Sequence, residues 1–293
     1  MGRGDLTDDG WARLRPHLPK SGQRRGRWAS HCRVINGILF RQRTGMPWRD
    51  LPARFGKWKT VYERHRRWST DGTWDKVFAA VLADADAEGR IDWSMVSVDS
   101  TSCRAHQHAA GARRKPPRVP GERRAPRQHR PDEGIGRSRG GLTCKIHLVG
   151  EGCRCPLALL ITPAQWGDAP QLIPVMERIH VGRLGGGRPR TRPDHLGGDK
   201  AYSSRRNHRY LRRRQIKHTI PETGNQRANR RSRGSRGGRP TGFDKTIYKR
   251  RNEVERTINA LKNFRAVAAR FDKRAYVFQG TVTVAAIRLW LRG

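Results

Sequence analysis

The segment from residue 248 to 262, YKRRNEVERTINALK, constrains the fold of this chain more than any other stretch. Placed on an α-helix with about 100° between successive residues, it separates into an apolar side and a polar side. The apolar side chains follow the spacing i, i+7, i+11 and i+14 and are Ile247, Val254, Ile258 and Leu261. The polar side chains fall within roughly 80° of one another and are Tyr248, Arg251, Glu255, Asn259 and Lys262. The pattern predicts a helix that packs on a core and holds Glu255 at the border with solvent, although a surface helix with paired charges would have a similar composition.

The chain is strongly basic. Its 293 residues include 63 Lys and Arg against 25 Asp and Glu, which gives a formal net charge of +38. Such an excess repels itself unless a polyanion neutralises it, so nucleic acid is the expected partner. The richest apolar run, residues 157–161, is far shorter than the roughly 20 residues of a membrane span, and residues 1–10 lack an apolar signal core. We therefore expect a cytoplasmic protein without a membrane partner.

Residues 1–89 are expected to form an all-α domain. A short helix at 48–55, broken by Pro52, a turn at Gly56 and a longer helix at 58–68 give the outline of a helix-turn-helix. Side chains on and beside the outer face of the longer helix can meet phosphates and base edges. They are Lys57, Lys59, Thr60, Arg66 and Arg67. The alternative is a basic helix that contacts only solvent.

From residue 90 to 293 strands and helices alternate, which predicts an α/β domain. A short strand at 95–98 ends at Asp99, and an acid at the carboxyl end of a strand is where α/β sheets place ligands. Asp168 is interpreted as the cap of a helix.

Further strands are expected at 142–149 and 156–161. Two basic segments near 109–140 and 226–242 contain almost no apolar residues, so they are expected to be disordered. The first of these segments is a candidate for ordering along a DNA backbone, or else a mobile surface loop.

Three stretches resemble DDE-type insertion-sequence transposases of the group named after insertion sequence five. Tyr248, Arg251, Glu255 and Lys262 match the signature Y-x2-R-x3-E-x6-K within FDKTIYKRRNEVERTINALKNFRAVAARFDK. The text VDSTSCRAHQHAAGARRK and, in the amino-terminal part, WRDLPARFGKWKTVYERHRRWS are similar to the same group. Asp199 matches the second aspartate of this group, but the text before it matches less well, because a more apolar strand is usual there, so Asp194 is the alternative.

The resemblance implies that Asp99, Asp199 and Glu255 are catalytic metal ligands on a ribonuclease-H-like mixed sheet flanked by helices. Three carboxylates that share a site repel one another unless divalent cations lie among them. Two Mg²⁺ ions are expected, with Mn²⁺ as the alternative. Tyr248, Arg251 and Lys262, on the same stripe as Glu255, are expected to contact DNA.

The implied function is a bacterial transposase, associated with the nucleoid, that binds the terminal inverted repeats of its element and catalyses DNA strand cleavage and strand transfer. Its partners would be double-stranded DNA of the element ends and of the target, bound by a homodimer or a higher oligomer. Two alternatives use the same residues: a metal-dependent nuclease of the same fold, and an inactive DNA-binding protein derived from a transposase. The second alternative predicts that the three acids do not converge.

Overall fold

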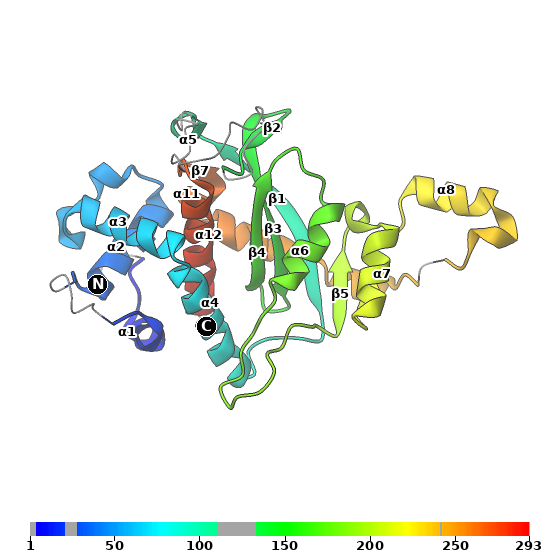
Figure 1. Ribbon diagram of the computed structural model, residues 1–293, viewed down its shortest axis with the longest axis horizontal. Coiled ribbons are helices and arrows are strands. Elements are labelled where there is room, and N and C mark those ends of the chain that lie inside the picture. Colours follow the sequence, from blue (N-terminus) through cyan, green and yellow to red (C-terminus); the bar gives the residue numbers. More distant parts are fainter. Residues whose placement is uncertain (1–3, 21–27, 111–132, 241, 293) are drawn as a thin grey trace, which may run out of the picture.

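A mixed sheet forms the centre of the molecule in the computed structural model, which describes residues 4–20, 28–110, 133–240 and 242–292 (Figure 1). Its seven strands in these ranges are β1 (Val96–Ala105), β2 (Gly136–Ser138), β3 (Gly141–Glu151), β4 (Pro156–Pro163), β5 (His195–Gly198), β6 (Lys217–Thr219) and β7 (Ala269–Arg270). β3 pairs antiparallel with β1 and β4, whereas β5 pairs parallel with β1 and β6. The order across the sheet is therefore β4-β3-β1-β5-β6, which confirms the predicted ribonuclease-H-like layout.

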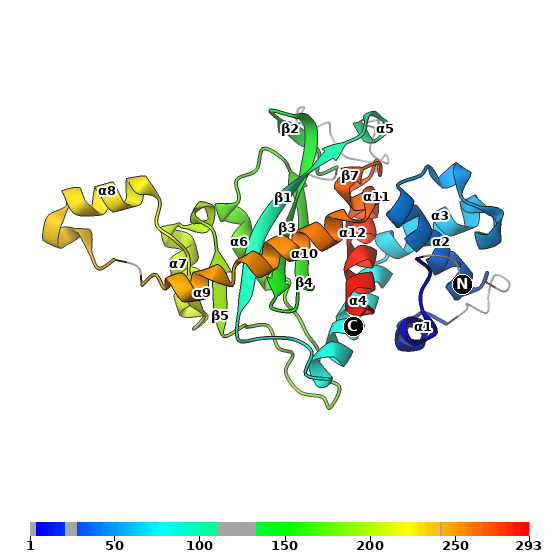
Figure 2. The same ribbon diagram turned by 180° about the vertical axis from the view of Figure 1, so that it is seen from behind.

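Helices cover both faces of this sheet. α10 (Asn252–Lys262) crosses one face against β1 and β3, and α6 (Leu172–Glu177) covers the other face against β3 and β4 (Figures 1 and 2). The apolar side chains of α10 are buried as predicted and are Val254, Ile258 and Leu261. The other helices after β1 are α5 (Gln107–Ala110), α7 (Arg205–Arg213), α8 (Gly224–Ser232), α9 (Lys245–Lys249), α11 (Arg265–Ala268) and α12 (Ala275–Trp290).

β1 is longer than the sequence predicts. The prediction of a strand that ends at Asp99 is wrong, because β1 pairs with β3 without interruption from Val96 to Arg104. Its parallel partner β5 stops at Gly198, opposite Val98. Asp99 therefore lies inside β1. It is the first residue of β1 beyond the point where the pairing with β5 ends.

The amino-terminal region contains α1 (Asp8–Leu14), α2 (His31–Thr44), α3 (Trp58–Thr70) and α4 (Thr73–Ala87). The short helix predicted at 48–55 is instead two 3₁₀ turns, Trp48–Asp50 and Ala53–Phe55, each preceded by a proline. Proline fixes φ and disfavours helical backbone in the residue before it, so these turns stay short. The buried side chains of α3 are Val61, Arg64, His65 and Trp68.

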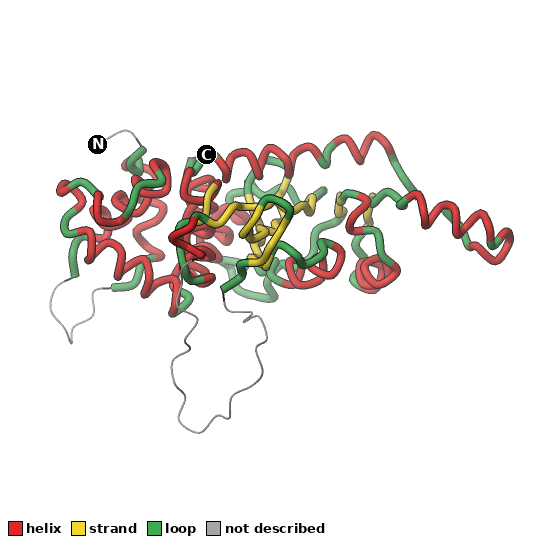
Figure 3. The backbone as a smooth tube through the Cα atoms, turned by 90° about the horizontal axis from the view of Figure 1, so that it is seen from above, coloured by secondary structure: helices red, strands yellow, loops and turns green. Residues whose placement is uncertain are grey.

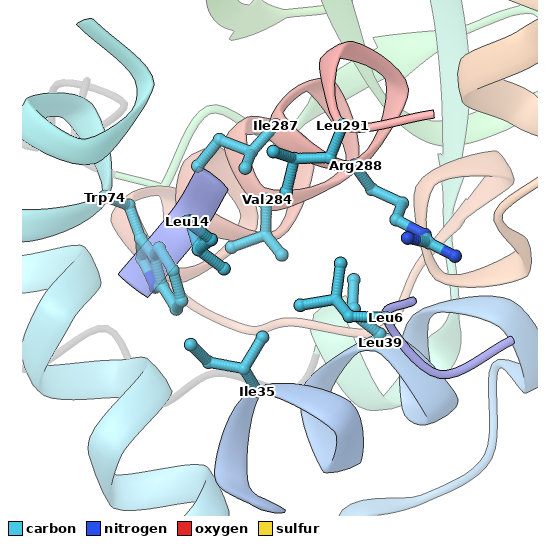
Figure 4. Close-up of a pocket in the computed structure, with 9 residues that line it drawn as sticks. All are labelled: Leu6, Leu14, Ile35, Leu39, Trp74, Val284, Ile287, Arg288 and Leu291. Carbon is cyan, nitrogen blue, oxygen red and sulfur yellow. The ribbon is translucent and has the colours of Figure 1, made fainter. Parts of the chain in front are cut away.

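α12 joins the amino-terminal helices to the sheet. It packs against α3 and α4 and also against β4, where the Trp290 indole N–H donates to the Pro156 carbonyl at 2.8 Å. Figure 4 shows where its apolar side chains meet those of the first helices; the side chains are Leu6, Leu14, Ile35, Leu39, Trp74, Val284, Ile287 and Leu291. One cluster of buried residues consequently extends from the amino-terminal helices to the sheet, and a second cluster lies between the sheet and α10.

A buried ion pair reinforces this junction. Arg41 of α2 donates to Asp272 at 3.3 Å, and their side chains are 2% and 3% exposed. Asp272 also accepts a hydrogen bond from the Thr281 hydroxyl at 2.7 Å, and His65 of α3 contacts the same hydroxyl at 3.1 Å. α2, α3 and α12 are thus held together by polar groups that are shielded from water.

The expectation of disorder at 226–242 is wrong for most of that segment, since residues 224–232 form α8 and residues 234–237 form a 3₁₀ turn. Of the first basic segment, 111–132 lie outside the described residues, whereas 136–138 form β2. Across the described ranges, no helix is long and apolar enough to cross a membrane.

Candidate active site

Two neighbouring strands place Asp99 and Asp199 side by side. The parallel register pairs Val98 with Gly198, and Asp99 and Asp199 are the residues that follow these two along the chain. Adjacent strands lie about 4.8 Å apart, so the aspartates emerge together where the strands separate. The Asp199 carboxylate accepts a hydrogen bond from the Ala201 N–H at 2.9 Å and so caps the 3₁₀ turn that follows β5.

Arg251 brings the third acid to this point. Its Nη1 lies 3.2 Å from Oδ2 of Asp99, and its Nη2 lies 2.5 Å from Oε1 of Glu255. The guanidinium also lies over the ring of Tyr248, 5.7 Å from the centroid. One cationic side chain therefore bridges an acid of β1 and an acid of α10.

The prediction of a single unbroken helix from Tyr248 to Lys262 is wrong. α9 ends at Lys249 and α10 begins at Asn252, and the amides of Arg250 and Arg251 bond to carbonyls three residues back. The turn between the helices is fixed by its own side chains, since the guanidinium of Arg250 donates to Asp92 at 2.7 Å. This turn places Arg251 between the two acids.

The environment of Asp99 includes the charges of the other two acids. Burial raises the pKa of Asp99, and the negative charges of Asp199 and Glu255 raise it further, whereas the Ser100 N–H and Arg251 oppose the shift. The side chain of Asp99 is 21% exposed and that of Glu255 is 46% exposed. The site therefore combines a partly desolvated aspartate with a more accessible glutamate.

The acids do not form a closed metal cage in this arrangement. Within the described ranges, which include all three acids, no group of three His, Cys, Asp or Glu side chains is close enough to hold a metal ion. The guanidinium of Arg251 lies between the carboxylates of Asp99 and Glu255. The donor atoms themselves fit a divalent cation, because carboxylate oxygens are the ligands that Mg²⁺ and similar ions prefer. Asp99, Asp199 and Glu255 are the residues that would hold such an ion.

Asp194, the alternative to Asp199, lies at the other end of β5. It precedes the strand, its side chain is 65% exposed, and it lies 3.9 Å from Arg190. Each residue of a parallel strand advances about 3.3 Å, so Asp194 is separated from the Asp99 position by the length of β5. The structure therefore assigns it no place beside Asp99.

The residues predicted to bind DNA fall into two separate groups. Arg251 contacts Asp99, the Tyr248 ring lies against Arg251, and Lys262 lies two turns beyond Glu255 at the end of α10. The second group is exposed on or next to α3, away from β5 in Figure 1, and consists of Lys57, Lys59, Thr60, Arg66 and Arg67. Arg66 is paired with Glu63 at 2.6 Å.

Asp168 occupies the predicted N-cap position, before the 3₁₀ turn Ala169–Gln171 that leads into α6, but its side chain makes no capping hydrogen bond there. Its carboxylate instead accepts hydrogen bonds from the Ser100 hydroxyl at 2.9 Å and from Lys145 at 3.0 Å. The hydroxyl of Tyr202 is buried next to this network without a hydrogen bond of ordinary geometry. Burial raises the pKa of Tyr202 well above its usual value, and the charges of Asp168, Asp99 and Asp199 add to the effect.

This network adjoins the site and was missed in the sequence. Ser100 and Lys145 lie on paired strands, but no spacing along the chain relates them to Asp168 or Tyr202. Only the pairing of β1 with β3 and the path of the chain after β4 bring these side chains together. The network supports the part of β1 that carries Asp99.

Two family models match this chain. Residues 94–290 match "Transposase DDE domain", and residues 6–78 match "Putative transposase of IS4/5 family". The uncharacterized protein y4sN of Sinorhizobium fredii is 41% identical over 110 residues, which are 37% of this chain and 83% of that protein. An uncharacterized 16.2 kDa protein of insertion element IS402 from Burkholderia cepacia is 38% identical over 112 residues, or 36% of this chain and 76% of that protein. A protein of Brucella ovis named "Putative transposase for insertion sequence element IS6501" is 29% identical over 151 residues, or 52% of this chain and 100% of that protein.

Proposed function

Because this chain belongs to the family of transposases with a DDE domain, we propose that it cleaves DNA at the ends of its own insertion sequence and joins those ends to a target duplex. One observation carries the proposal for the site. The parallel register of β1 and β5 aligns Asp99 with Asp199, and Arg251 links Asp99 to Glu255 of α10. Acids that are 100 and 56 residues apart along the chain thus come near one another where β5 ends beside β1.

DDE transposase domains use divalent metal ions. In this chain Asp99, Asp199 and Glu255 would hold them, and we propose Mg²⁺, with a pair of ions in the complete site. Ions of this kind activate a water or a 3′-hydroxyl and stabilise the charge that develops at phosphorus.

The protein side chains then have distinct tasks. Arg251 pairs with both Asp99 and Glu255, and from this position it would bind a phosphate of the cleaved strand. Tyr248 supports the guanidinium through its ring. Asp199 keeps its orientation through the Ala201 N–H, so its second oxygen remains available to a ligand.

The test of this proposal uses the purified full chain and a duplex that contains one end of the element. In the presence of Mg²⁺ we expect a new 3′-hydroxyl at the element end and, with a second duplex present, a covalently joined product. Chelation of the metal should abolish both products. Cleavage without any joined product would favour a nuclease, and the absence of both would contradict the proposed function.

α3 is proposed to recognise the terminal inverted repeat. Its exposed side carries Arg66 and Arg67 close to Lys59 and Thr60, while its buried side packs on the core. A helix held in this way can enter a major groove and contact phosphates as well as base edges.

Replacement of Arg66 and Arg67 together by Ala is expected to weaken binding to the element end. Each lost phosphate contact lowers the slope of log K against log salt by about 0.9, so the slope should fall by roughly 1 to 2. Binding measured at several salt concentrations gives this slope. Glu63→Gln is the matched control: it releases Arg66 from its ion pair, so binding should be unchanged or tighter. An unchanged slope in the double variant would remove α3 from the DNA contact.

A further inference from the structure

An arm projects from the molecule between the two segments that carry the site residues. It comprises residues 223–240 and contains α8 followed by a 3₁₀ turn. Figures 1 to 3 show α8 extending beyond the sheet, on the side away from the amino-terminal helices. Neither α8 nor the turn buries a residue, so the arm has no hydrophobic core of its own that would fix its position.

Every charged side chain in the arm is basic. Residues 224–240 contain six arginines and no Asp or Glu. The arginines are Arg227, Arg230, Arg231, Arg233, Arg236 and Arg239. Arg230 pairs with Glu222 at the root of the arm, and the other five are exposed. Like charges one turn apart on a helix destabilise it, so a partner that neutralises them would stabilise the arm.

The root of the arm is fixed next to the site. Thr223 and Gln226 form a reciprocal capping box at the start of α8. The Gln226 side chain also donates to the Ser203 carbonyl at 3.0 Å and accepts from the Ser203 hydroxyl at 2.9 Å. Ser203 follows Asp199 by four residues, and the far end of the arm leads into α9 with Tyr248. The arm is therefore attached on both sides to segments that carry site residues.

We propose that the arm binds the sugar-phosphate backbone of duplex DNA beside the phosphodiester held at Asp99, Asp199 and Glu255. This inference rests on the proposed function and names a second contact with the same substrate. Arginine side chains bind phosphates whatever the base sequence, and half to two-thirds of protein–DNA hydrogen bonds go to the sugar-phosphate backbone. The arm therefore adds affinity and holds the duplex in position, whereas α3 supplies sequence recognition.

A protein partner fits the arm less well. Residues 224–240 offer Ala228 and Pro240 as their only apolar side chains, and stable protein interfaces have an apolar centre. A second copy of this chain carries 63 basic and 25 acidic residues, so charge also opposes contact between the arm and another copy.

The test compares two double variants of the full chain on element-end duplex with the metal chelated, so that only binding is measured. Arg227→Ala with Arg231→Ala removes two exposed charges from α8. Arg183→Ala with Arg188→Ala removes two exposed charges from the loop between α6 and β5. We expect the arm variant to lower the salt slope by roughly 2 and to weaken binding about tenfold or more at physiological salt. We also expect it to lose backbone protection on one side of the cleavage site in a hydroxyl-radical footprint. The loop variant should keep the footprint and most of the slope.

Arg227→Lys with Arg231→Lys should restore the slope, because phosphate contact requires charge. Thermal unfolding of the arm variant should match the parent, since the arm buries no core residue. An unchanged salt slope and footprint in the arm variant would overturn the proposal. A loss of oligomers in that variant at an unchanged salt slope would also overturn it. If the arm variant behaves like the parent while the parent cleaves DNA, the proposed function stands and the arm contact fails. If the parent neither binds nor cleaves, both fail.

Discussion

Glu255→Gln should abolish metal-dependent cleavage of element-end DNA, with a loss in rate on the order of a thousandfold or more. The substitution keeps the size of the side chain but removes the negative charge that a divalent cation requires. The side chain is 46% exposed, so the fold should tolerate the change. Binding to the element end should remain, because the variant retains Arg251 and all the basic residues of α3. Cleavage is measured as release of the 3′-hydroxyl strand, and binding is measured separately with the metal chelated.

Glu253→Gln provides the matched control on the same helix. Its carboxylate lies 3.3 Å from Arg250 and does not contact Arg251 or Asp99. This variant should therefore cleave at nearly the parental rate. Parental cleavage by Glu255→Gln would remove Glu255 from the catalytic site, and equal losses in both variants would point to a defect of α10 as a whole.

Asp272→Asn should destabilise the protein by about 3 to 5 kcal/mol, because it leaves the buried guanidinium of Arg41 without a counter-charge. Burial alone would raise the pKa of Asp272, but Arg41, His65 and the Thr281 hydroxyl lower it below its ordinary value. A carboxylate with a lowered pKa stabilises the fold above the pKa of the unfolded chain, which is about 3.9, and this contribution is lost as the pH falls. Urea unfolding should therefore show a large difference between parent and variant near pH 7 that shrinks on acidification below about pH 4.

Glu63→Gln is the control for this experiment, since it removes an exposed ion pair with Arg66. Exposed pairs contribute about 0 to 1 kcal/mol, so the unfolding midpoint should hardly move. A loss of less than about 1 kcal/mol in Asp272→Asn would contradict the assigned role of the buried pair. The pair links α2 to the start of α12. Its loss should therefore cause the amino-terminal helices to unfold at a lower urea concentration than the sheet.

Local periodicity determined the secondary structure where one face of an element is buried. The spacing of Val254, Ile258 and Leu261 predicted the buried side of α10, and the inward side of α3 followed from the same rule. The arm shows the limit of this signal. Its composition predicted disorder, although the sequence contains the capping pair Thr223 and Gln226, a local start signal that was overlooked.

The sequence by itself determined the alternation of strands and helices, because these patterns are encoded within a few residues, and its resemblance to DDE-type transposases nominated Asp99, Asp199 and Glu255. Tertiary structure alone decided the extent of β1, which depends on pairing with β3, and the position of Arg251 between two acids. It also decided that Asp168 supports Ser100 and that α12 packs on the first helices. These features join residues that are far apart along the chain, 68 positions in the bond Ser100–Asp168 and 152 positions in the bond Asp99–Arg251. Such contacts depend on sheet register and helix packing, which no local pattern specifies.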